Sequence, residues 1–288
     1  MASPTSPASL DAVRNGGDEE DTPWTFVAGR KGRRKGRCAV DTALRFHAHA
    51  AGSQPGQRKA AAPAAPAADT IQQSVEHIRT DHARIAAKWR GQPSCRRLEE
   101  RIAAAARLHA TVTQAVCLGA GSFGGPLDGG EHVRRAHVQT AAFLLIVDML
   151  RQHCNATIPC FFQEPLYTEA DCLYLRSLGH SVIEAPAASH MITRSTLVFA
   201  IHLPTRGYLD CLARSPPAML IGTSYGCYEG LPQFAESRAS QMLDNLRDVD
   251  ATFDGFAFPR EEHDHCFSDT WIYWRPAEAA VSVTGEPG

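Results

Sequence analysis

The chain lacks any apolar run near the roughly 18–20 residues that a membrane-spanning helix requires. It also lacks an apolar segment near its first residue that would serve as a secretory signal. Charges of the two signs nearly balance, with a formal net charge of −2, which argues against a protein that coats nucleic acid. The nine cysteines form no C-x-x-C pair, so neither a disulfide framework nor a zinc ribbon is expected. These absences predict a protein of a reducing, cytoplasmic compartment with no membrane partner.

Residues 1–68 contain little that could form a core. Ala/Pro-rich, acidic and basic segments follow one another there, and such a composition buries too little apolar surface to offset the entropy of ordering. We therefore predict a disordered arm over 1–68 and a disordered tail over 277–288. Within the arm, Trp24–Val27 is apolar and Arg30–Arg37 is basic. The basic run is either a nuclear-import or anion-binding patch or a solvated charged arm, and only the first would add a nuclear location.

Residues 69–111 are predicted to form a helical lead-in. An apolar stripe at helical spacing begins near Asp69, continues through Trp89 and stops at Gly91. His82 fills a gap in this stripe and is interpreted as a packing residue. A second, alanine-rich helix is expected over residues 96–110.

Residues 112–276 alternate between short apolar runs and helical periods. Near-continuous apolar strands separated by helices are typical of a parallel sheet covered on both faces. The fold class predicted is therefore α/β, a Rossmann-like and mostly parallel sheet. The last two strands are expected to form an antiparallel pair at a sheet edge. The expected strands are 114–118, 158–162, 181–184, 197–201, 218–221, 253–258 and 270–274.

The first of these strands runs into the sequence VCLGAGSFGG, residues 116–125, which contains a literal G-x-G-x-x-G. In a dinucleotide-binding fold the helix begins inside this motif and its N-terminus holds the pyrophosphate. Here the loop continues through further glycines, and helical periodicity resumes only near Val133. The context argues against a dinucleotide fingerprint and for a loop over the strand end.

Polar residues cluster where the expected strands end. In open α/β sheets, ligands bind beyond the carboxyl ends of the strands. The candidate ligand-binding residues are Gly119, Gly121, Ser122, Glu164, Thr223 and Ser224, with His202 as a candidate general base or a loop-capping histidine. A glycine turn after the first strand and a carboxylate after the second also resemble the way methyltransferases hold S-adenosylmethionine. The cofactor stays open among S-adenosylmethionine, a nucleotide and haem. The run His263–Cys266 is interpreted as an exposed loop, and no metal site is predicted.

Five landmarks occur in a fixed order: LGAGSF (118–123), an R-x-x-x-Q spacing (Arg135 and Gln139), EPLYTEAD (164–171), FAIHLP (199–204) and IGTSY (221–225). On these landmarks, residues 112–275 resemble the sensitivity-to-red-light-reduced (SRR-like) domain family. The chain departs from the family pattern at three places: it has Glu164 where aspartate is common, Leu203 where cysteine follows the histidine, and Thr223 where asparagine is common.

The resemblance implies a regulatory protein more than an enzyme. Family members are linked to circadian timing and light signalling in plants, and others to microtubule stability or haem metabolism. The function expected is that of an intracellular regulatory protein that binds a small ligand at the strand ends. An S-adenosylmethionine-dependent transferase and a protein-interaction scaffold with a vestigial pocket stay open as alternatives. The identities of the ligand and of any protein partner are left open.

Overall fold

The computed structural model describes residues 68–109, 111–124, 130–212, 216–229 and 239–277. Residues 1–67 of the predicted arm, which include Trp24–Val27 and the basic run, lie outside the described residues, as do residues 278–288 of the predicted tail. Seven strands form one sheet in the order β3-β2-β1-β4-β5-β7-β6. The strands are β1 Gln114–Leu118, β2 Cys160–Gln163, β3 Ser181–Val182, β4 Thr196–Ala200, β5 Met219–Thr223, β6 Asp254–Ala257 and β7 Thr270–Trp274.

Strands β1 to β5 are parallel to one another, and β7 runs antiparallel to both β5 and β6. The predicted α/β class with a mostly parallel sheet is therefore confirmed, as is the antiparallel pair at one edge. Strands β1, β4 and β5 are buried almost throughout. Burial on both faces is the reason that their sequences read as continuous apolar runs and do not alternate.

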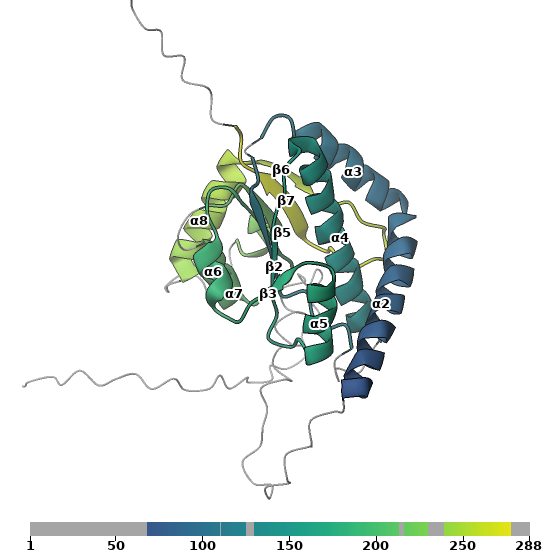
Figure 1. The fold of residues 1–288 in the computed structure, drawn as a ribbon. Coiled ribbons are helices and arrows are strands. Elements are labelled where there is room, and N and C mark those ends of the chain that lie inside the picture. Colours follow the sequence, from purple (N-terminus) through teal and green to yellow (C-terminus); the bar gives the residue numbers. More distant parts are fainter. Residues whose placement is uncertain (1–67, 110, 125–129, 213–215, 230–238, 278–288) are drawn as a thin grey trace, which may run out of the picture. The chain divides into compact units, whose positions relative to one another are not determined.

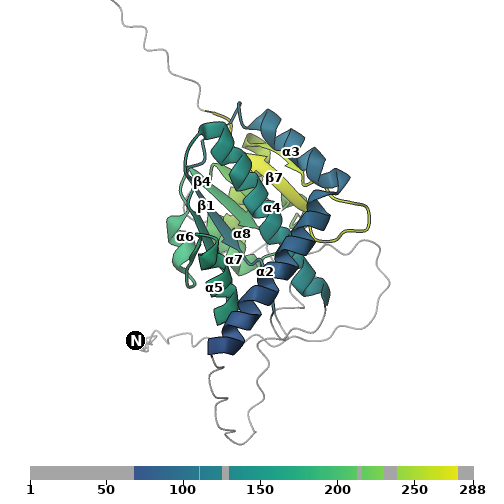
Figure 2. The same ribbon diagram turned by 45° about the vertical axis from the view of Figure 1, so that its right-hand side comes forward.

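Helices cover both faces of the sheet (Figures 1 and 2). One face carries α2 Ala68–Arg90, α3 Pro93–Ala105, α4 Gly130–Cys154 and α5 Glu169–Ser177, and the other carries α6 Ala187–Met191, α7 Thr205–Leu212 and α8 Ala239–Thr252. Successive strand residues point to opposite faces, so Cys117 and Phe199 pack under the first layer, while Val116 and Val198 pack under the second.

The lead-in helices belong to the same core as the sheet. Helix α2 places Val75, Ile78 and Trp89 in the core beneath the first layer. Helix α3 begins at Pro93, earlier than the predicted residue 96, because proline is well suited to the first turn of a helix. None of the described helices is both long and apolar enough to cross a membrane.

The chain order reverses beside β1. From β1 the chain proceeds to β2 and β3 on one side, and then returns to β4 and β5 on the other side. The reversal lies between β1 and β4, which makes the carboxyl ends of these two strands the topological switch point of the sheet. Ligands of open α/β sheets bind at such points.

Candidate functional site

The predicted site residues lie at one edge of the sheet. Leu118 at the end of β1 lies beside Gln163 of β2 and Ala200 of β4, and Ala200 lies beside Gly222 of β5. The segments after these strands therefore leave the sheet on the same side, which we call the carboxyl edge. Gly119, Gly121, Ser122, Glu164, His202, Thr223 and Ser224 all lie at or just after these strand ends.

Glu164 holds the glycine loop, which we define as residues Gly119–Gly124. Its carboxylate accepts a hydrogen bond from the Gly121 N–H at 3.0 Å and another from the Leu166 N–H at 2.9 Å. Glu164 is only 7% exposed. The carboxylate after β2 therefore ties its own loop to the loop after β1, and it does so with charge-assisted bonds.

A second carboxylate, Asp171, holds the other half of the glycine loop. It is fully buried and accepts four hydrogen bonds. Two come from the glycine loop, the Ser122 hydroxyl at 2.6 Å and the Phe123 N–H at 3.1 Å. The other two come from the N–H and hydroxyl of Thr168. Asp171 and Thr168 also form the capping box of α5.

Two glycines of the loop have backbone conformations that favour glycine. Gly119 has φ +69° and Gly121 has φ +84°. A Cβ on Gly119 would collide with the side chain of Leu203, and one on Gly121 would lie 3.5 Å from Cβ of Ala136 in α4. The loop is thus packed between the segment after β4 and the first turns of α4. Helix α4 begins at Gly130, outside the motif.

His202 follows β4 in a left-handed conformation, with φ 54°. Its Nε2 lies 2.8 Å from the carbonyl oxygen of Ser268. A carbonyl can only accept, so Nε2 carries the proton and the neutral ring keeps its lone pair on Nδ1. Burial lowers the pKa of His202 below its usual value, which favours this neutral form.

The residues at the end of β5 differ in accessibility. Thr223 is fully buried, and its N–H donates to the hydroxyl of Tyr208, so Thr223 supports the strand end from inside. Ser224 is half-buried, and its N–H donates to the Asp269 carbonyl at 2.9 Å. Ser224 and His202 therefore share a neighbouring segment, residues 268–269.

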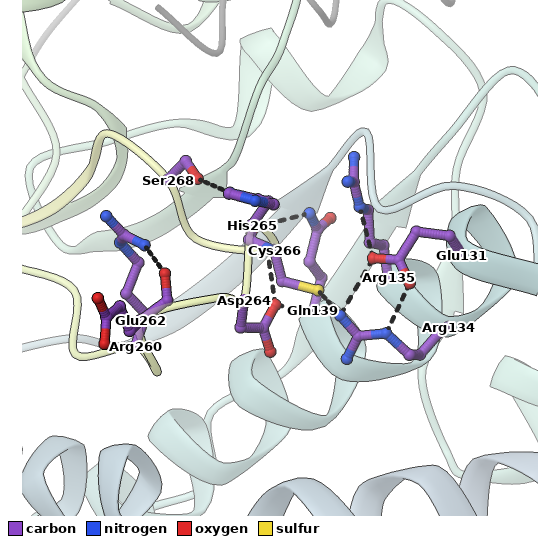
Figure 3. A network of polar contacts seen from close by, with 10 residues as sticks. All are labelled: Glu131, Arg134, Arg135, Gln139, Arg260, Glu262, Asp264, His265, Cys266 and Ser268. Atoms are coloured by element: carbon purple, nitrogen blue, oxygen red, sulfur yellow. Dashed lines mark hydrogen bonds and ion pairs between the residues drawn. The ribbon is translucent and has the colours of Figure 1, made fainter.

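That segment belongs to the β6–β7 loop, residues 258–269, which Figure 3 shows beside the start of α4. Arg134 of α4 donates to Asp264 at 3.1 Å and to Sγ of Cys266 at 3.3 Å. Gln139 donates to the Cys266 carbonyl at 3.4 Å. The prediction of an exposed loop over His263–Cys266 is wrong for Cys266, which is fully buried because its thiol and carbonyl face α4.

The cysteines of the described residues form no disulfide bonds. Burial raises the pKa of the Cys117 and Cys266 thiols well above the usual value. A buried, protonated thiol is a poor nucleophile. Among the described residues, no group of three or more His, Cys, Asp or Glu side chains is arranged to hold a metal ion.

A shallow groove of about 520 Å³ lies at the opposite, amino-terminal edge of the sheet. It is lined by Thr111, Ile192, Thr193, Arg194, Ser195 and Arg275. None of the predicted site residues contributes to it. The arginines and hydroxyls of this groove bond within the protein. The candidate site is therefore the carboxyl edge, where the topology and the contacts bring the predicted residues together.

The fold and the strand-end residues define a Rossmann-like α/β domain whose glycine loop is tied down by carboxylates. The family model of the SRR1 domain matches residues 90–274. The chain therefore belongs to the SRR1 domain family.

A solved structure that resembles the chain is the SAH-bound methyltransferase PaMTH1 of Podospora anserina. The two are 12% identical with a TM-score of 0.32, and the match covers 88% of this chain and 100% of that one. A likeness of this size carries no argument about function. No curated protein matches the chain.

Proposed function

We propose that the carboxyl edge binds a small ligand, and that the chain acts through this binding as an intracellular regulatory protein. The observation that carries the proposal is the contact between Glu164 and Gly121. It sets the carboxylate that follows β2 beside the glycine loop that follows β1, and β1 borders the topological switch point, where ligands of open α/β sheets bind. In the proposal Gly119, Gly121, Ser122, Glu164 and Ser224 contact the ligand, and Thr223 supports them from inside.

The finer role follows from the family. Regulation of circadian timing or of light signalling belongs to this proposal, as does a location in the cytoplasm and the nucleus. The basic run Arg30–Arg37 is the proposed import signal. Replacing Arg33, Arg34 and Lys35 with alanine should then shift a fluorescent fusion towards the cytoplasm. An unchanged distribution would exclude the import signal.

The second candidate function is S-adenosylmethionine-dependent transfer. It is favoured by the carboxylate after β2 facing the glycine loop after β1, and by His202, whose Nδ1 is available as a base. A methyltransferase assay with labelled S-adenosylmethionine distinguishes the two functions. Binding without transfer to any acceptor supports the regulatory function.

The test is a thermal-stability screen of the full chain against S-adenosylmethionine, nucleotides, NAD and haem. A ligand at ~100 times its dissociation constant should stabilise the chain by about 2.7 kcal/mol. Glu164→Gln should then weaken binding about ten- to a hundredfold, because charge-assisted hydrogen bonds contribute ~1.5–3 kcal/mol.

Glu164 also holds the loop, so the substitution needs a matched control. Thr168→Ala removes a helix cap and one bond to Asp171, which should lower stability by about 1 kcal/mol without touching Glu164. Equal loss of affinity in both variants would mean that Glu164 acts only through the loop. If no ligand stabilises the chain, the proposal fails and the interaction scaffold is favoured.

A further inference from the structure

The glycine loop donates most of its backbone N–H groups within the protein. A phosphate-binding loop needs these groups free, because they bind the phosphate oxygens. Four of the six residues Gly119–Gly124 already have acceptors. Gly119 donates to the Gln163 carbonyl, Gly121 to Glu164, Phe123 to Asp171 and Gly124 to the Ser122 hydroxyl.

The arginines in the first turns of α4 are also occupied. Ala136 abuts Gly121, and the preceding residues Arg134 and Arg135 both bond the carboxylate of Glu131 (Figure 3). Arg134 reaches Glu131 at 2.9 Å, and Arg135 reaches it at 3.2 Å. Arg134 bonds Asp264 as well. Arginine can bind an anion through two parallel hydrogen bonds, but here Arg134 and Arg135 already bond carboxylates of the protein itself.

Six charged groups that the structure describes at this edge carry a net negative charge. Arg134 and Arg135 pair with Glu131 and Asp264, and two further carboxylates, Glu164 and Asp171, hold the glycine loop, so the balance of these six groups is 2 − 4 = −2. Hydrogen bonds from Arg134 and Arg135 lower the pKa of Glu131. Burial alone would raise the pKa of Asp264, but hydrogen bonds from the Cys266 N–H and from Arg134 outweigh it and lower this pKa. Both carboxylates therefore stay ionised. Burial lowers the pKa of His202, so His202 adds no positive charge near neutrality. A phosphate placed against Gly119–Gly124 would meet these carboxylates, and few N–H groups of this described loop would be free to bind it.

We propose that the carboxyl edge selects a neutral or cationic ligand that bears hydroxyl groups and no phosphate, such as a nucleoside or a sulfonium nucleoside, and that Glu131 sets this selectivity by neutralising Arg134 and Arg135. The inference rests on the proposed ligand-binding function and narrows its ligand class. Hydroxyls of such a ligand bond the remaining lone pairs of Glu164, and a positive charge is favoured by the surplus of carboxylates.

The experiment measures dissociation constants of the full chain by calorimetry for adenosine, AMP, S-adenosylmethionine and S-adenosylhomocysteine. Adenosine is expected to bind at least tenfold more tightly than AMP, which differs from it only by the phosphate. S-Adenosylmethionine is expected to bind more tightly than S-adenosylhomocysteine, which lacks the sulfonium charge. AMP binding as tightly as adenosine would overturn the inference and leave the proposed function standing.

The Glu131→Gln variant tests the role of Glu131 directly. The substitution releases Arg134 and Arg135 from a carboxylate at an exposed position, so the affinity for AMP should rise about tenfold while that for adenosine changes less than twofold. Glu169→Gln removes an exposed carboxylate from the first turn of α5 and should change neither constant. An unchanged AMP constant in Glu131→Gln would remove Glu131 from the assignment. Absence of binding by all four compounds would overturn the inference, whereas the proposed function fails only if the wider stability screen also finds no ligand.

Discussion

The glycine loop and the β6–β7 loop lie at the same edge of the sheet, but groups of different accessibility hold them. Each loop is anchored by a buried phenylalanine: Phe123 packs against His137, and Phe267 stacks on Phe258 at 4.0 Å between ring centroids. The polar anchors differ. Asp171 is fully buried and accepts from main-chain and hydroxyl donors, whereas Asp264 is 11% exposed and bonds Arg134, whose side chain is 35% exposed.

This difference determines how much each anchor contributes to stability. Removing a buried carboxylate leaves its donors without acceptors, and each such donor costs free energy. When a partly exposed ion pair is broken, water solvates the group that remains, so the loss of stability is small. We therefore expect Asp171 to contribute more to stability than Asp264 does.

The largest effect is expected from Asp171→Ala. The substitution leaves the Phe123 N–H, the Thr168 N–H and the Ser122 hydroxyl without their acceptor. We expect the free energy of unfolding to fall by about 4 kcal/mol, measured by urea denaturation. The exposed Asp148, which pairs with Arg151 within α4, provides the control, and Asp148→Ala should cost only about 0.5 kcal/mol. Equal losses would remove the distinction between buried and exposed anchors.

A pH-dependent effect of about 3 kcal/mol is expected beside the glycine loop. His82 and His137 are buried with their Nδ1 atoms 3.2 Å apart, and burial lowers the pKa of each to about 4. The unfolded chain takes up these protons near pH 6.5, so stability is complete above that pH and is lost as the pH falls towards 4. A shift of this size corresponds to about 3 kcal/mol for the first proton.

Unfolding curves between pH 7 and pH 4 test this expectation. The double variant His82→Phe and His137→Phe should have a flatter profile, with a residual slope from His180 and His202, whose pKa values burial also lowers. Parallel profiles for the variant and the original chain would show that the pair does not control the acid response.

The sheet could be predicted because its strands are buried on both faces and its turns carry glycine. Gln114–Leu118 and Thr270–Trp274 match the expected bounds, and the other strands are displaced by one to a few residues. Helices α6 and α7 were not predicted, because segments of five and eight residues contain too few helical periods to separate from loops.

For the candidate site, the sequence predicts which residues lie at the same edge of the sheet but not the contacts between them. The carboxyl ends of parallel strands lie at one edge of a sheet, so Gly121, Glu164 and His202 could be grouped without knowledge of any contact. The role of Asp171 could not be predicted: its place in a capping box is local, whereas its bond to Ser122 joins residues 49 apart. The pairing of Arg134 with Asp264, across 130 residues, leaves no pattern in the sequence either. Whether the grouped residues bind a ligand stays a prediction.

The smallest effect is expected at the β6–β7 loop, from Asp264→Asn. In the structure, the Cys266 N–H donates to Asp264 at 2.9 Å, and the asparagine keeps an oxygen that can accept this bond. The variant loses only the negative charge that pairs with Arg134. Arg134 retains Glu131 as a partner. We therefore expect the free energy of unfolding to fall by about 1 kcal/mol, less in high salt because a partly exposed pair is screened. Asp244→Asn, which breaks an exposed pair with Arg247 on α8, should cost less still. If Asp264→Asn cost as much stability as Asp171→Ala, the β6–β7 loop would be held as firmly as the glycine loop. The ion pair of Asp264 and Arg134 would then be better shielded from water than its exposure indicates.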